Sequence, residues 1–250
     1  MRLPAIRGVI DRRILVNYRV APEVLAKLLP APFRPQVVHG WGMAGICLIR
    51  LKHIRPALVP RAFGLRSENA AHRIAVEWDT PDGVRQGVFI ARRDTSSHVS
   101  TIAGGTLFPG EHRHATFRVD EGKGAWLVAL ESDDGRTRLK VEARAASGLP
   151  PGSVFGSLAE ASAFFARGSL GYSPARKPGK FDGLELRCGR WRVEPLEVER
   201  VESSFFDDRA RFPAGSSVLD CALLMRGIEH EWQGRESIRS AGDYSCSSTW

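Results

Sequence analysis

Residues 65–98, LRSENAAHRIAVEWDTPDGVRQGVFIARRDTSSH, decide the fold that this sequence predicts. Their centre, Asp79-Thr80-Pro81-Asp82-Gly83, has the composition of a tight turn. Proline presets φ, aspartate can bond to its own backbone, and glycine accepts the positive φ that closes the loop. Runs rich in Val, Ile, Phe and Trp alternate with polar residues on both sides of this turn. Two such runs around a turn predict an antiparallel β-hairpin.

The register of this hairpin determines which side chains share a face. We expect Trp78 to lie opposite Val84. In the same register, His72 lies opposite Ile90, and successive side chains alternate between the two faces. One face would then carry Glu68, His72, Ile74, Val76, Trp78, Val84, Val88, Ile90, Arg92 and Asp94. A slip of one residue would move the whole set to the other face.

The open end of the predicted face is polar, while the end near the turn is apolar. Charged side chains are costly to bury unless they are paired or used in binding. An apolar wall that ends in Glu68, His72 and Arg92 therefore favours a small-molecule cavity. A structural clamp is the alternative, because structural ion networks use the same residue types as functional sites. In that clamp, Arg92 and Arg93 would pair with carboxylates. Their partners would be Glu68 and Asp94.

Further strands are predicted on both sides of the hairpin. Residues 14–20 alternate in hydrophobicity, and residues 41–52 form a nearly continuous apolar run. The first pattern is typical of a half-buried strand and the second of a fully buried one. Residues 125–131 and 136–144 flank an Asp-Asp-Gly turn, so they form a second predicted hairpin.

Two helices have clear start signals. Pro22 suits the first turn of a helix that Pro30 ends. Ser157 and Glu160 have the spacing of a capping box at the start of a second helix. The sequence contains no repeat or linker, so we predict one domain over residues 1–250. Its class would be mostly β (α+β), a curved antiparallel sheet or closed β-barrel with a few peripheral helices.

The composition is that of an ordinary folded protein. The chain is 43% hydrophobic and 26% charged, and no stretch has the continuous apolar length of a membrane span. Its first residues, MRLPAIRGVIDRR, lack the apolar core of a signal peptide, which favours a cytoplasmic bacterial protein without a membrane partner. The net charge of +8 is spread along the chain and forms no basic run. No nucleic-acid partner is therefore predicted.

Cysteine and histidine spacing gives weak signals. Cys47, Cys188, Cys221 and Cys246 show no CxxC motif, so free thiols are predicted, with Cys47 acting as a small hydrophobic residue. His112 and His114 would share a strand face and could bind a metal. A longer ligand motif is missing from the sequence, so neither a metal nor a cofactor is predicted, and the two histidines are expected to line the cavity or the surface.

Four segments resemble a known family. They are residues 14–33 (ILVNYRVAPEVLAKLLPAPF), 67–78 (SENAAHRIAVEW), 91–97 (ARRDTSS) and 223–232 (LLMRGIEHEW). Together they are similar to the bacterial family called domain of unknown function 2071. That family is similar to the acetoacetate decarboxylase-like superfamily. The resemblance implies the closed, curved sheet of those enzymes and, by analogy, a homo-oligomer.

The resemblance extends to two decarboxylase motifs. Arg66-Ser67-Glu68 falls where those enzymes carry an active-site glutamate, so the resemblance implies the same role for Glu68. Ile90-Ala91-Arg92-Arg93 falls on their Tyr-Pro-Lys-Lys segment, which places Arg92 on the lysine that forms the Schiff base. Imine formation needs a neutral amine, whereas arginine stays protonated and is not nucleophilic. Lysine-dependent decarboxylation is therefore not expected.

These observations predict a small-molecule-binding protein. A guanidinium group at the end of an apolar pocket suits bidentate capture of a carboxylate, so the ligand would be an organic acid or a related oxygen-rich metabolite. The substrate-binding residues would be Arg92, Arg93, Asp94 and Trp78. The small, Gly-rich segment 95–110 would curl over the cavity mouth. The alternative is a lyase- or hydrolase-type enzyme in which Glu68 and His72 transfer protons without a covalent intermediate.

Overall fold

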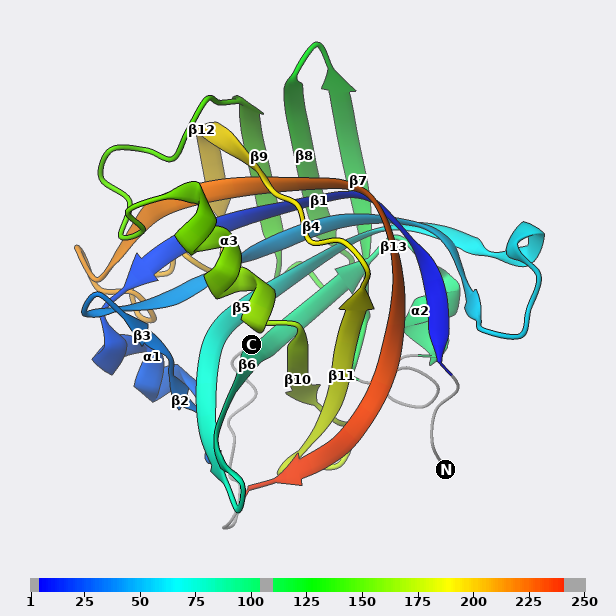
Figure 1. Cartoon of the computed structure of the whole chain (residues 1–250), viewed down its shortest axis with the longest axis horizontal. Helices are drawn as coiled ribbons and strands as arrows, with labels where there is room; N and C mark the ends of the chain where they lie inside the picture. The colour runs from blue at the N-terminus through cyan, green and yellow to red at the C-terminus, as the bar shows by residue number, and fades with distance from the viewer. Residues whose placement is uncertain (1–4, 104–109, 241–250) are drawn as a thin grey trace.

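The structure is a computed structural model that describes residues 5–103 and 110–240 (Figure 1). One sheet of 13 strands dominates these residues, and three short α-helices and one 3-10 turn lie at its periphery. The predicted mostly β class is therefore confirmed. Residues 104–109 of the segment expected over the cavity mouth, and Cys246, lie outside the described residues.

The elements have the following bounds. The strands are β1 Ile6–Val20, β2 Arg34–Pro35, β3 Val37–Val38, β4 Trp41–Pro56, β5 Leu65–Thr80, β6 Gly83–Thr95, β7 Arg113–Gly122, β8 Ala125–Ser132, β9 Arg138–Ala145, β10 Leu170–Pro174, β11 Lys180–Cys188, β12 Glu194–Ser203 and β13 Ser217–Arg239. The helices are α1 Pro22–Leu28, α2 His98–Ala103 and α3 Leu158–Arg167, and the 3-10 turn is η1 Arg61–Phe63. Within the described residues, no helix is long and apolar enough to span a membrane.

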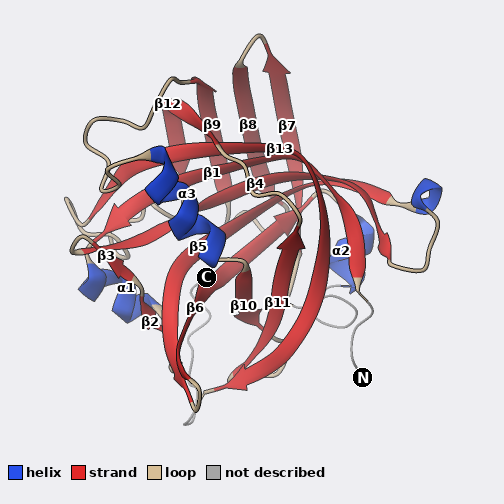
Figure 2. Ribbon diagram, viewed as in Figure 1, coloured by secondary structure: helices blue, strands red, loops and turns tan. Residues whose placement is uncertain are grey.

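The strands close into two rings that share a wall (Figure 2). The shared wall consists of β13, β1, β4, β5 and β6, hydrogen-bonded in that order. Strands β10 and β11 connect β6 back to β13 and complete the small ring. Strands β7, β8, β9 and β12 make the same connection by another path and complete the large ring. The sheet therefore has the curved, closed form that the sequence predicted.

The two faces of the shared wall pack into different cores. Ile14, Ile74 and Phe89 lie on one face, in the main core, together with apolar residues of β8, β9 and β12. Tyr172 of β10 and Phe181 of β11 belong to the main core as well, so strands of both rings contribute to it. Leu15 and Cys47 lie on the opposite face, under apolar residues of α3. This second face is called the α3 face below.

The predicted hairpin is present as β5 and β6, but its predicted register is wrong. Trp78 pairs with Arg85 rather than with Val84. This shift of one residue places Phe89 in the main core. Val88 and Ile90 were expected on the same face as Trp78. They lie instead on the α3 face, where Gly171 of β10 approaches both side chains.

A β-bulge at the open end of the hairpin returns the residues that follow it to their predicted faces. Arg73 pairs with Ile90, whereas His72 pairs with Arg92, so Ala91 is left without a partner. One extra residue in a strand exchanges the faces of all residues that follow it. Arg92 therefore returns to the face of His72, as predicted. Its neighbour Arg93 points to the α3 face.

Local signals predicted the ends of α1 and α3 well. Helix α1 begins at Pro22 and ends before Pro30. At α3, the Ser157 side chain accepts a hydrogen bond from the Glu160 backbone amide, as the capping box requires. The carboxylate of Glu160 accepts from the Gly156 amide and so caps a second free donor.

Candidate functional site

The six predicted site residues are distributed over four places. Glu68 lies in an ion-pair network at the open end of the hairpin. His72, Arg92 and Asp94 lie together on the main-core face. Trp78 lies in the main core near the turn, and Arg93 lies on the α3 face.

Glu68 is held by two arginines from neighbouring strands. Its carboxylate accepts a hydrogen bond from Arg12 Nη2 at 2.6 Å and another from Arg50 Nε. Glu121 of β7 bonds to the same two arginines, with 3.0 Å between its Oε1 and Arg50 Nη2. The four side chains form a network of alternating charge across β1, β4, β5 and β7. This is a structural clamp of the kind that the sequence left open, but Arg12 and Arg50 hold Glu68 in place of Arg92 and Arg93. The other expected pair, Arg92 with Asp94, is present.

Arg92 is fully engaged by two carboxylates. Its Nε and Nη2 donate to Asp94 at 3.0 and 2.8 Å, and its Nη1 and Nη2 donate to Asp134 at 3.0 and 2.8 Å. The Arg92 side chain is only 9% exposed, and that of Asp94 is fully buried. Burial raises the pKa of Asp94 although Arg92 opposes the shift. Every nitrogen of the Arg92 guanidinium therefore donates a hydrogen bond to a carboxylate.

His72 is buried beside this clamp. Its ring lies 4.8 Å from the ring of Phe205, and neither of its nitrogens has a hydrogen-bond partner among the described residues. Burial lowers the pKa of His72 to about 3, and the charges of Arg92 and Arg211 contribute. The imidazole is therefore neutral at physiological pH.

Trp78 contributes to packing. Its indole meets the rings of Phe33 and Tyr172 edge to face, at centroid distances of 5.6 and 5.3 Å. The side chain is 3% exposed. Offset and edge-to-face aromatic contacts of this kind stabilise a core.

A surface pocket of about 340 Å³ borders the Arg92 clamp. Its lining residues are Thr101, Glu111, His112, Arg113, His114, Asp133, Asp134 and Arg176. His114 Nδ1 lies 2.8 Å from Asp133 Oδ2, and its ring stacks on that of His98. No group of three or more His, Cys, Asp or Glu side chains in the described part of the chain could hold a metal. His112 and His114 thus line a pocket, one of the two roles left open for them.

The α3 face carries a basic group that the sequence analysis missed. Cys47 of β4 pairs with Ala71 of β5, and Ala71 pairs with Arg93 of β6, so the three side chains share this face. Arg73 follows two residues after Ala71 in β5, so its side chain also lies on the α3 face. Arg13 of β1 reaches the same place, because its Nε donates to Cys47 Sγ at 3.3 Å. Arg13, Arg73 and Arg93 are called the arginine cluster below.

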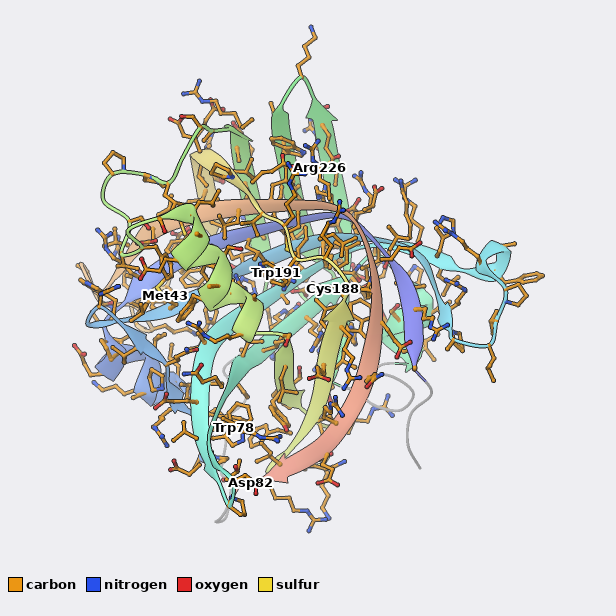
Figure 3. The ribbon with its side chains drawn as sticks, in the orientation of Figure 1. Met43, Trp78, Asp82, Cys188, Trp191 and Arg226 are labelled. Carbon is orange, nitrogen blue, oxygen red and sulfur yellow. The ribbon has the colours of Figure 1, made fainter. Side chains whose placement is uncertain are left out.

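The arginine cluster contacts neutral groups. Arg73, 7% exposed, donates from Nη2 to Asn17 Oδ1 at 2.6 Å and lies over the ring of Phe165. Arg93 donates from Nε to the Ser173 hydroxyl at 3.1 Å. Arg13 lies over the indole of Trp191, which is labelled in Figure 3 close to α3. None of the three arginines forms an ion pair with a carboxylate within residues 5–103 and 110–240.

This lack of negative charge affects the electrostatics of the α3 face. Burial lowers the pKa of Arg73 and that of Arg93 to about 10, and the charge of Arg13 adds to the shift of Arg73. Burial also lowers the pKa of His230, close to Arg13, to about 4. Several buried nitrogens here have no partner among the described residues, namely Arg13 Nη1, Arg73 Nε, Trp191 Nε1 and both nitrogens of His230. Such unpartnered groups are rare in native proteins.

Solved structures place the fold in a known class. An acetoacetate decarboxylase-like enzyme from Sphingomonas wittichii RW1 superposes with a TM-score of 0.57 at 15% identity, over 94% of this chain and 92% of that chain. Acetoacetate decarboxylase from Legionella pneumophila gives 0.59 at 12% identity, over 96% and 88%. The enduracididine biosynthesis enzyme MppR, complexed with pyruvate, gives 0.60 at 11% identity, over 97% and 91%. The protein therefore has an acetoacetate decarboxylase-like fold.

The family follows from the sequence itself. Residues 10–228 match the family DUF2071, described as an uncharacterized conserved protein, and the chain belongs to that family. No curated protein matches the chain significantly. The resemblance noted in the sequence is thus confirmed, both for the family and for its decarboxylase-like fold.

Proposed function

We propose that this protein binds a small organic acid, or a related anionic metabolite, at the arginine cluster on the α3 face. The single observation that carries this proposal is the gathering of three guanidinium groups without a carboxylate partner in the described residues. A buried charge without compensation is strongly destabilising. A bound carboxylate would supply the missing charge and accept bonds from the unpartnered nitrogens.

The cluster is a better anion site than Arg92. Both carboxylates on Arg92 would have to leave before a ligand could take their place. Asp94 would then remain buried and unpaired, which is costly. Arg73 and Arg13, in contrast, each keep a buried nitrogen free among the described residues.

Two of the structural relatives support the ligand class. One is a decarboxylase of acetoacetate by name, and another is a complex with pyruvate. Both compounds are short acids with a ketone group. We infer that this chain handles such an acid without a Schiff base, because arginines form the cluster and a guanidinium group cannot act as the nucleophilic amine. The alternative, proton transfer by Glu68 and His72, has less support, since ion pairs occupy Glu68 and burial keeps His72 neutral.

Isothermal titration calorimetry with pyruvate and acetoacetate tests the proposal, and acetone serves as the uncharged control. We expect both acids to bind and acetone to give no heat. Arg73→Met should weaken binding by about tenfold or more, since a charge-assisted hydrogen bond contributes roughly 1.5–3 kcal/mol. Arg138→Met, which removes an exposed arginine of β9, is the matched control. Unchanged affinity in Arg73→Met, or no binding of either acid to the natural protein, would refute the proposal.

A further inference from the structure

The thiol of Cys47 lies in the middle of the arginine cluster. Its Sγ accepts the hydrogen bond of Arg13 Nε at 3.3 Å, and the residue is 7% exposed. The sulfur is also close enough to Arg73 and Arg93 to interact electrostatically with both. Arg73 is itself buried and keeps its Nε without a partner in the described chain. Three guanidinium groups thus lie near the thiol, and none of them pairs with a carboxylate among the described residues.

Three cations lie near the Cys47 sulfur. Neighbouring cations stabilise a thiolate, and the thiolate is the form that attacks electrophiles. Cys221 provides a contrast on the same face. It is 2% exposed, and burial together with the charge of Asp220 raises the pKa of its thiol. The two buried cysteines should therefore differ in reactivity.

We propose that Cys47 is a nucleophile that reacts preferentially with electrophiles carrying a carboxylate. The inference rests on the proposed function, because the same guanidinium groups would hold the carboxylate. With a short 2-oxo acid, Sγ would form a bond to the carbonyl carbon while the π pair of the C=O bond moves to oxygen. The proton lost by the thiol ends on that oxygen, so the product is a thiohemiketal and no further reactant is needed. The addition is reversible.

Alkylation kinetics test this assignment, with iodoacetate and iodoacetamide as probes. In both reactions a bond forms from Sγ to carbon, the carbon–iodine bond breaks and iodide leaves. A free thiol reacts faster with the neutral amide. We expect Cys47 in the native protein to react faster with iodoacetate, as followed by peptide mass spectrometry. Cys47 in the urea-denatured protein is the control and should keep the ordinary order.

Variants of the cluster provide the second measurement. Arg73→Met should lower the rate of Cys47 with iodoacetate by about tenfold, corresponding to roughly 1.4 kcal/mol, and change the iodoacetamide rate less. Arg93→Met should act in the same direction and serves if the first variant folds poorly. If Cys47 stays unmodified, or prefers iodoacetamide, while pyruvate still binds in an Arg73-dependent manner, this inference fails and the proposed function stands. If that binding is also missing, both fail.

Discussion

His72 and Arg92 lie directly opposite each other across β5 and β6, and they do so because Ala91 has no partner in the pairing. The bulge also separates Arg92 from its neighbour Arg93. On the main-core face, Arg92 forms ion pairs with both Asp94 and Asp134. Arg93 donates a hydrogen bond to the Ser173 hydroxyl on the other face. Two adjacent arginines thus have opposite electrostatic roles.

This difference predicts opposite effects on stability. Arg92→Met would leave the buried Asp94 carboxylate without its cation, so the free energy of unfolding should fall by about 3 kcal/mol or more. Arg93→Met removes a cation that has no anionic partner in the described residues and should change stability by less than about 1 kcal/mol. Urea denaturation of both variants gives the comparison. An equal loss in the two would contradict the distinct roles.

Acid should destabilise the protein through its buried histidines. The pKa of His72 is lowered from 6.5 in the unfolded chain to about 3 in the fold, mainly by burial. The unfolded state therefore binds the proton first, so the stability due to neutral His72 is complete above pH 6.5 and is lost as the pH falls toward 3. The slope should approach about 1.4 kcal/mol per pH unit. Between pH 7 and pH 5, the unfolding free energy should fall less steeply with decreasing pH in His72→Phe than in the natural protein. Parallel curves would refute the assignment.

The Glu68 network should be a stability element. Glu68→Gln leaves Arg12, whose side chain is 3% exposed, with one carboxylate fewer, so we expect a loss of roughly 2–3 kcal/mol. Glu131→Gln breaks an exposed ion pair with Arg138 and should cost less than about 1 kcal/mol. Thermal unfolding distinguishes the two. A Glu68 variant as stable as the Glu131 variant would show that the network contributes little.

The arginine cluster should reduce stability when no anion is bound. Arg73→Met removes a buried cation without a carboxylate partner in the described residues, so the variant should unfold at a higher temperature than the natural protein in buffer. Saturating pyruvate should raise the unfolding temperature of the natural protein alone, because a ligand stabilises only the state that binds it. A variant that melts at a lower temperature without ligand would contradict this expectation.

Local sequence signals predicted much of the fold. The Pro81-Asp82 turn, the apolar run of β4, the ends of α1 and the cap of α3 depend on neighbours in the chain, and each is present. The bulge at Ala91 was not predictable, because it depends on how β5 and β6 fit their neighbours in the sheet. A period of two fixes side-chain alternation but not the pairing register.

The candidate site was harder to predict than the fold. Arg13, Arg73 and Arg93 come from three strands, and only the pairing of β1, β4, β5 and β6 brings them together. A signal was present in the sequence, since Arg73 lies between Ala71 and Ala75 on its face of the strand. The second carboxylate partner of Arg92 is distant in the sequence, because Asp134 lies in the turn between β8 and β9. Long-range pairings of this kind leave no local pattern.

The unpaired residue at Ala91 decides which of the two neighbouring arginines faces α3. The strand carries one residue more than regular pairing allows, and this extra residue returns Arg92 to the face of His72. If Ala91 were instead paired with His72 in a regular ladder, Arg92 would pair with Ala71 and face α3, and Arg93 would face the main core.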